Sequence, residues 1–279
     1  MKAYLVLGVL ISPAVPATAA DIGPPIAYSI GRNLYLASSD GSSTKLLYSG
    51  RSRKSIFGVQ LKPGGGEVAF EETACCSIPT SSLLKIVRFD SSGTRVGTPA
   101  SLSVCGHVTT LAYHPGDGSL LYASSCNQPL KRLNTTSMAS TSVSLAHKAS
   151  KVSWLPNGTE FIYAANAKIW RVPVATPSSP TAVGDADCVQ SLDAGNVTGR
   201  ALWTNACGGA LKLINLATGV SSSLRQGAEA RFSPTDSQYA YLTPQTTSGR
   251  YLLISQTDGS GTQVRIGAQA KYLSVDWRK

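Results

Sequence analysis

The sequence has few charged residues and no long apolar segment. Charged side chains make up 14% of its 279 residues, against roughly 25% in an ordinary soluble chain. Long amphipathic helices and coiled coils need Glu, Lys and Arg in quantity, so this composition argues against both. No segment approaches the roughly 18 consecutive apolar residues of a transmembrane helix, and we expect none. Hydrophobic residues still reach 42%, which argues against disorder.

Catalytic and metal-binding motifs are also missing. The sequence contains no G-x-S-x-G elbow and neither a P-loop nor an H-E-x-x-H pattern. It has no C-x-x-C pair, and only three histidines are present to complete a zinc site. We therefore predict no cofactor and no metal site, and we assign no catalytic residue.

Residues 1–20 have the pattern of a secretory signal peptide. Lys2 precedes an apolar run over residues 3–11, and small residues follow at positions 17–20, where signal peptidase would cleave. We expect residues 1–20 to be removed and residues 21–279 to form a single domain. The mature chain is then periplasmic or secreted, by bacterial export.

Six cysteines agree with an oxidising compartment. Two pairs have similar separations, 21 and 19 residues, and each pair begins in a short loop and ends just after a strand-like run. On this pattern we predict the disulfides Cys105–Cys126 and Cys188–Cys207. Cys75 and Cys76 remain as a candidate vicinal disulfide, which the sequence leaves open.

Four segments share a repeat in which a large apolar residue, one spacer, Pro and a turn precede an alternating strand. They are 61–70, 113–122, 154–163 and 232–241. The prolines recur at intervals of 52 and 41 residues, and then of 78 residues across a degenerate copy at 191–204. A period near 40 residues with four short strands per unit is typical of a β-propeller blade. Trp154 and Trp277 stand at the aromatic position of the repeat, where packing between blades explains them.

The two ends of the chain complete the blade count. Residues 26–48 contain three strand-like runs without the opening strand, and residues 272–277 supply one strand with nothing following it. Pairing these segments closes the ring and removes its exposed edges. The predicted fold is therefore all-β, a six-bladed β-propeller with four-stranded blades.

The repeat resembles that of the TolB-type six-bladed propellers of bacterial periplasmic proteins, over about residues 25–277. The separate α/β domain that precedes the propeller in TolB has no counterpart in this sequence. The resemblance implies a non-catalytic protein that binds other proteins. The Asp-Gly turn usual in the motif is altered here, for example to Thr235-Asp236-Ser237 in the sixth blade.

In a propeller, the loops that join the second strand to the third and the fourth strand to the next blade lie on one face. All six cysteines fall in such loops, so disulfides would stiffen this face, and rigid loops often form binding sites. The candidate ligand or partner contacts on this face are Arg51, Arg53, Lys54, Glu71, Glu72, His107, His147, Asp187 and Arg231.

The formal charge of +10 favours an anionic partner. Nucleic acid is disfavoured by the expected compartment and by the absence of a nucleic-acid-binding motif. Two hypotheses follow for a chain that we expect to be monomeric. The favoured one is a scaffold that binds an envelope or extracellular protein through the stiffened face. The alternative is a binder of, or a lyase or hydrolase acting on, an anionic glycan or small metabolite in the central channel.

Overall fold

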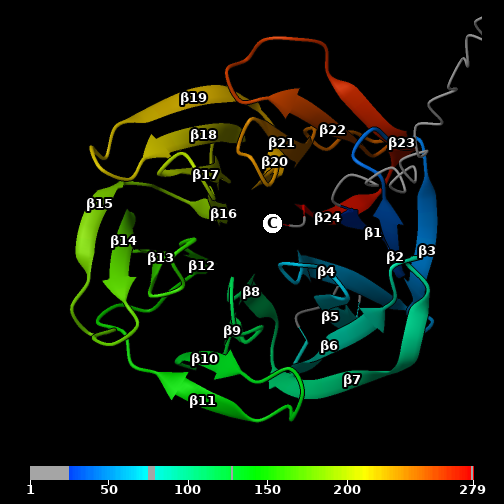
Figure 1. Ribbon diagram of the computed structural model, residues 1–279, viewed down its shortest axis with the longest axis horizontal. Helices are drawn as coiled ribbons and strands as arrows, with labels where there is room; N and C mark the ends of the chain where they lie inside the picture. The colour runs from blue at the N-terminus through cyan, green and yellow to red at the C-terminus, as the bar shows by residue number, and fades with distance from the viewer. Residues whose placement is uncertain (1–24, 75–78, 127, 278) are drawn as a thin grey trace, which may run out of the picture.

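The computed structural model describes residues 25–74, 79–126, 128–277 and 279. These residues form 24 strands and no helix, and the strands make six four-stranded antiparallel sheets. The sheets are arranged as a ring around a central axis (Figure 1). The predicted six-bladed β-propeller is therefore confirmed, and in the described part of the chain no helix is long and apolar enough to cross a membrane.

The blades are numbered along the chain, and their strands are given from the innermost outward. Blade 1 contains β24 (Tyr272–Trp277), β1 (Ile26–Ile30), β2 (Asn33–Ala37) and β3 (Thr44–Ser49). Blade 2 contains β4 (Lys54–Leu61), β5 (Glu67–Ala74), β6 (Ser81–Phe89) and β7 (Arg95–Cys105). Blade 3 contains β8 (Val108–Tyr113), β9 (Leu120–Ser124), β10 (Leu130–Leu133) and β11 (Ser140–Val143).

The other three blades follow in the same order. Blade 4 contains β12 (Lys151–Trp154), β13 (Glu160–Ala165), β14 (Lys168–Pro173) and β15 (Thr181–Asp185). Blade 5 contains β16 (Val189–Ala194), β17 (Arg200–Asn205), β18 (Ala210–Asn215) and β19 (Ser221–Gln226). Blade 6 contains β20 (Ala228–Phe232), β21 (Gln238–Leu242), β22 (Arg250–Gln256) and β23 (Val264–Ala270).

Blade 1 is assembled from segments far apart in the sequence. β24 pairs antiparallel with β1, so that Val275 lies opposite Tyr28 and Trp277 lies opposite Ile26. Three strands near the start of the described chain thus share a sheet with one strand near its end, as predicted. This pairing closes the ring, so β1 has no exposed edge to which a strand of another molecule could pair.

Six buried apolar clusters fill the six interfaces between neighbouring blades. The large residue that opens the repeat lies in these interfaces, as for Tyr113 and Phe232. Trp154 is 6% exposed and Trp277 is 2% exposed, which confirms that packing explains both. The hydrophobic core is therefore a set of layers between blades, and each repeat depends on its neighbours for burial.

The proline of the repeat begins a tight turn between the first and second strands. In blade 4, Pro156 follows Leu155, and the Gly158 amide donates to the Leu155 carbonyl at 3.0 Å. Proline suits this position because its φ is restricted to about −65°. Gly158 has a φ of 65°, in the left-handed region that glycine enters without steric cost.

Blade 5 lacks this motif, and a carboxylate from blade 6 stabilises its loop instead. Asn196 stands where the other repeats have proline. The buried Asp236 accepts hydrogen bonds from the amides of Asn196 and Val197, both at 2.7 Å, and of Thr198 at 2.9 Å. Asp236 occupies the position of the turn glycine, with a φ of 58°. The sixth repeat thus has Asp236 in place of the turn glycine because this carboxylate binds the β16–β17 loop of blade 5.

Neighbouring blades are also joined near the axis by polar side chains of the innermost strands. Each accepts a hydrogen bond from a backbone amide of the next innermost strand, at 2.7 to 3.4 Å. The acceptors are Ser274, Asp276, Thr110, Ser153, Ser191 and Asp193.

The antiparallel blades give the ring two distinct faces. The turn face carries the loops that join first to second strands and third to fourth strands. The disulfide face carries the loops that join second to third strands, and fourth strands to the next blade. Both disulfides that the structure contains lie on the latter face, between the β7–β8 and β9–β10 loops and between the β15–β16 and β17–β18 loops.

Candidate functional site

The innermost strands surround a polar central channel. At the turn face the channel opens as a pocket of about 290 Å³. About two residues closer to the disulfide face, along the innermost strands of blades 2 to 6, the channel narrows to a space of about 40 Å³. One repeat position, directly before the large apolar residue or, in blade 5, before Ala194, lines these two spaces in every blade. The residues at this position are Gln60, Ala112, Ser153, Asp193, Arg231 and Asp276.

Arg231 is the central cation of the channel. Its Nε lies 3.2 Å from Asp276 Oδ1, and its Nη2 lies 3.7 Å from Glu229 Oε2. Its Nη1 donates to the Ala230 carbonyl at 2.9 Å. Burial acts to lower the pKa of Arg231, but the carboxylates of Glu229 and Asp276 outweigh it and raise that pKa. The guanidinium therefore lies against two carboxylates inside the protein, although its Nε forms no hydrogen bond of good geometry.

Asp276 connects three blades. Its Oδ2 accepts the Leu61 amide of blade 2 at 2.7 Å, and its Oδ1 accepts Gln60 Nε2 at 3.2 Å. On its other side it contacts Arg231 of blade 6. Burial raises the pKa of Asp276 from 3.8 to about 7, Asp193 acts in the same direction, and Arg231 opposes both. A carboxyl group on the ring-closing strand thus titrates near neutral pH.

Two lysines of the channel are engaged as well. Lys279 Nζ lies 2.6 Å from Asp193 Oδ1 at the turn-face opening. Lys151 Nζ donates to the Thr109 carbonyl at 2.5 Å, nearer the disulfide face. Burial lowers the pKa of Lys151, with Glu229 opposing this effect. The channel cations therefore already have partners in the fold.

These contacts disfavour an anionic ligand in the channel. Such a ligand would have to displace Asp193, Asp276 or Glu229 from the cations that they neutralise. The narrow part also holds little more than a water molecule. Within the described ranges, no group of three or more His, Cys, Asp or Glu side chains is arranged to hold a metal ion.

A second pocket, of about 580 Å³, lies on the turn face between blades 1 and 2, with Leu36 and Phe89 on its wall. Lys45 also lines it, and the Lys45 ammonium donates to the Ser92 carbonyl at 3.0 Å and to Thr94 Oγ1 at 2.7 Å. The Lys45 ammonium is therefore already hydrogen-bonded to the β6–β7 loop beside the pocket.

Sequence reasoning missed the roles of Asp193, Asp276 and Lys279. A signal for the first two was present, because the position before the large apolar residue is polar in five of the six repeats. Aligning the repeats on that residue would have brought Asp193 and Asp276 into one ring with Arg231. Lys279 stands at the proline position of the repeat, two residues after Trp277, but nothing in the sequence indicated that a lysine there would reach the channel.

The two predicted disulfides are confirmed. Cys105 and Cys126 have Cα atoms 5.8 Å apart, and Cys188 and Cys207 have Cα atoms 5.7 Å apart. Each joins the loop that enters a blade to the loop between the second and third strands of that blade. The candidate vicinal pair at positions 75 and 76 lies outside the described residues.

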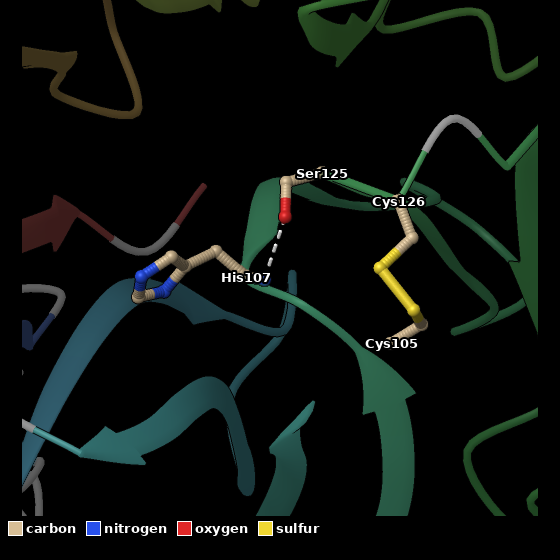
Figure 2. The surroundings of a disulfide bond; sticks show 4 residues. All are labelled: Cys105, His107, Ser125 and Cys126. Carbon is tan, nitrogen blue, oxygen red and sulfur yellow. Dashed lines mark hydrogen bonds between the residues drawn. A yellow bond between two sulfur atoms is a disulfide. The ribbon is translucent and has the colours of Figure 1, made fainter. Parts of the chain in front are cut away.

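A hydrogen-bonded group adjoins the first disulfide (Figure 2). The His107 amide donates to Ser125 Oγ at 2.9 Å, which joins the same two loops as the bond between Cys105 and Cys126. His107 Nδ1 lies 3.0 Å from Glu71 Oε1. The disulfide and these polar contacts together restrain the loops of blade 3 on the disulfide face.

Glu71 and Glu72 are both buried, at 2% and 1% exposure. They are consecutive on β5 and therefore point to opposite faces of the strand, Glu71 towards blade 3 and Glu72 towards blade 1. Glu72 accepts Tyr48 Oη at 3.1 Å and lies 3.0 Å from Lys85 Nζ. Burial acts to raise the pKa of Glu72, but the Arg51 amide and Lys85 outweigh it and lower that pKa. Both carboxylates are thus held by contacts within the protein, at the interfaces between blades.

The remaining candidates lie at three separate places, at or beside the β3–β4, β11–β12 and β15–β16 loops. Arg51 and Arg53 are exposed, and Lys54 is half-buried, at the β3–β4 loop. His147 packs against Trp170 of β14, the third strand of its blade, with ring centroids 4.5 Å apart. Asp187 is exposed in the β15–β16 loop.

We expect removal of the Cys188–Cys207 bond, by replacing both cysteines with serine, to lower the free energy of unfolding by about 3 kcal/mol. The bond closes a loop of about 20 residues, and the chain-entropy relation gives this value. Urea unfolding of variant and wild type measures the difference. A double-serine variant as stable as the wild type would contradict the entropic account.

Neither a protein-family model nor a curated protein sequence matches this chain. Solved structures do match it. TolB from Acinetobacter baumannii aligns with a TM-score of 0.74 and 18% identity, over 92% of this chain and 67% of that chain. A chain of a nidogen–laminin complex aligns with a TM-score of 0.69 and 11% identity, over 92% of this chain and 99% of that chain.

A third match has a different activity. An oligogalacturonate lyase in complex with manganese aligns with a TM-score of 0.52 and 12% identity, over 76% of this chain and 68% of that chain. The fold of this chain thus aligns with TolB, with a chain of a nidogen–laminin complex and with an oligogalacturonate lyase, so the fold alone does not assign a function. What this chain shares with all three is the β-propeller fold.

Proposed function

We propose that this protein is an exported, non-catalytic β-propeller that binds a partner protein through its disulfide face. The observation that carries the proposal is that both disulfides, and the His107–Ser125 hydrogen bond beside one of them, restrain loops of that single face. Loops that are already ordered lose less conformational entropy on binding. The propeller then acts as a rigid platform for protein association.

The proposal includes the compartment. Residues 1–20 act as the signal peptide, and residues 21–279 form the mature domain in the periplasm or outside the cell. Two disulfides agree with an oxidising compartment, and the resemblance to TolB-type repeats points the same way. The mature protein is a monomer that presents one face to its partner. Its intact mass after export tests the cleavage position.

The alternative function, a lyase, hydrolase or binding protein for an anionic sugar or metabolite, places its ligand in the central channel. The paired state of Arg231 and Lys279 and the narrow middle of the channel count against it. We therefore favour the scaffold.

Photo-crosslinking from defined positions tests the scaffold. A photoreactive amino acid is placed at Ser52, Gln128 or Ala206 on the disulfide face, and as controls at Ser91 or Ala217 on the turn face; all five residues are exposed. The full-length variants are produced in the native host, irradiated, and the adducts identified by mass spectrometry. We expect one protein partner to be recovered from the disulfide-face positions and not from the controls.

Two outcomes would contradict the scaffold. Adducts formed equally from both faces would indicate non-specific contact, and no adduct from any disulfide-face position would remove the proposed binding surface. Thermal unfolding of each variant at the wild-type temperature shows that the replacement has not disturbed the fold.

A further inference from the structure

Exposed charge is distributed unevenly over the disulfide face. Six cations lie on the loops or strand ends of blades 6, 1 and 2, which are neighbours on the right-hand side of Figure 1. We call this set the basic crescent. It consists of Arg250, Lys271, Arg32, Arg51, Arg53 and Lys54, of which Arg250 and Lys54 are half-buried and the others exposed.

The basic crescent has no neutralising carboxylate within the described residues. None of its six cations forms an ion pair there, and Arg250 Nε donates only to Gln245 Oε1, at 3.0 Å. The exposed carboxylates on the loops and strand ends of the disulfide face belong to Asp185 and Asp187, between blades 4 and 5. Asp185 already pairs with Lys168 at 2.7 Å. The channel cations Arg231 and Lys279 contact carboxylates, whereas the cations of the basic crescent have no such contact among the described residues and can bind an external anion.

The backbone beneath the crescent is held by a buried carboxylate. The Arg51 amide donates to Glu72 Oε1 at 3.0 Å, and Glu72 is itself held by Tyr48 and Lys85. A β-carbon at Gly50 would lie 2.7 Å from Glu72 Oε1, so the loop fits closely over this carboxylate. Glu72 thus positions the loop that carries three of the six cations.

The two loops of blade 1 are also bonded to each other. The Gly50 amide donates to the Arg32 carbonyl at 2.7 Å, and the Ile56 amide donates to the Gly31 carbonyl at 2.9 Å. Arg53 adopts a φ of 59°, which a non-glycine residue keeps only where its surroundings determine it. The cations are therefore presented from an ordered backbone, which lowers the entropic cost of binding.

We propose that the basic crescent is the docking surface for an acidic segment of the partner protein, rich in Asp and Glu. This proposal rests on the scaffold function above and specifies its partner. The guanidinium groups of Arg32, Arg51 and Arg53 match carboxylates in paired hydrogen-bond geometry. Unpaired positive charge at the surface also accelerates association with a negatively charged partner.

The composition of these loops favours a protein over a membrane or a glycan. The exposed large apolar residues in the described chain lie on outer strands or towards the turn face, so the crescent offers no side chain for insertion into lipid. The loops 31–32, 50–54 and 243–250, and Lys271, contain no aromatic residue on which a sugar ring would stack. Ordered, polar, cationic loops are suited to a surface of carboxylates.

A charge-reversal variant of the mature protein tests this proposal. Arg51→Glu, Arg53→Glu and Lys54→Glu are combined, and the matched control combines Arg95→Glu, Lys148→Glu and Arg200→Glu, which lie outside the crescent and change the net charge equally. Binding is measured to immobilised poly-L-glutamate, to phosphatidylglycerol vesicles and to polygalacturonate, at about 0.05 and 0.15 M salt.

We expect the wild type to bind poly-L-glutamate in preference to the other two probes, more weakly at higher salt. The crescent variant should lose about 30-fold or more in affinity, and the control should stay within about threefold. Equal losses in both variants, or a preference for vesicles or polygalacturonate, would overturn the proposal.

The same variants separate this proposal from the scaffold function. If the crescent variant still gives the disulfide-face adduct of the wild type, the crescent is not the docking surface and the scaffold stands. If the wild type gives no adduct, the scaffold function itself fails. Circular dichroism confirms that both triple variants remain folded.

Discussion

Replacing Asp276 by alanine is expected to lower the free energy of unfolding by about 3 to 5 kcal/mol. The change removes the acceptor of the Leu61 amide and of Gln60. It also leaves the guanidinium of Arg231 with a single carboxylate neighbour, Glu229 at 3.7 Å. At pH 8, above the raised pKa of Asp276, the carboxylate is ionised and pairs with Arg231. Removing one partner of this buried pair leaves the other charge desolvated, so the loss is measured at that pH. Urea unfolding followed by tryptophan fluorescence measures the loss.

The matched control is Ser153→Ala, at the same repeat position of blade 4. Ser153 accepts one amide, that of Ala194, at 2.9 Å and carries no charge. Its loss should cost about 1 kcal/mol. Equal destabilisation by the two substitutions would show that the charge network of Asp276 adds nothing to a simple hydrogen bond between blades.

The second large effect is a dependence of stability on pH. Burial raises the pKa of Asp276 to about 7 in the folded state, from 3.8. The folded protein therefore binds this proton more tightly than the unfolded chain does. The resulting stabilisation is complete below about pH 4 and is lost as the pH rises through about 7. At 1.36 kcal/mol per pKa unit it amounts to about 4 kcal/mol, of which about 3 kcal/mol is lost between pH 5 and 8.

An Asp276→Asn variant isolates this contribution. The amide cannot ionise, so the difference in unfolding free energy between wild type and variant should change by about 3 kcal/mol between pH 5 and 8, with the wild type losing stability. Other carboxyl groups, such as that of Glu72, have a lowered pKa in the folded state. Their contribution to stability is lost as the pH falls, which is opposite to the effect of Asp276. They are common to both proteins and cancel. A difference that is independent of pH would show that Asp276 is already ionised at pH 5.

Both effects concern ring closure, because β24 is the strand that joins the two ends of the described chain. Ser274 and Asp276 of β24 bind the Val59 and Leu61 amides of blade 2. Closure therefore depends on side-chain bonds near the axis as well as on strand pairing. Loss of Asp276 would therefore weaken the contact between blades 1 and 2.

The sequence by itself determined the architecture. A repeat of about 40 residues with a large apolar residue, Pro and a turn predicts blades, because each repeat needs a neighbour to bury its apolar face. The incomplete runs at 26–48 and 272–277 predicted the shared blade, since three strands and one strand complete a sheet. The two disulfide pairs followed from matching separations and contexts of the cysteines.

Only the tertiary structure decided which polar side chains are available. Glu71 and Glu72 lie near the end of β5, close to a loop, and the sequence therefore suggested that they contact a partner. Both are buried in interfaces between blades. Arg231 contacts carboxylates in the channel, whereas Arg51 and Arg53 are exposed and form no ion pair within the described residues. Local sequence cannot distinguish these cases, because the pairing of a charge depends on groups up to about 215 residues away in the chain, as between Leu61 and Asp276. The repeat therefore predicts where each strand lies, and the closed ring decides which charges meet.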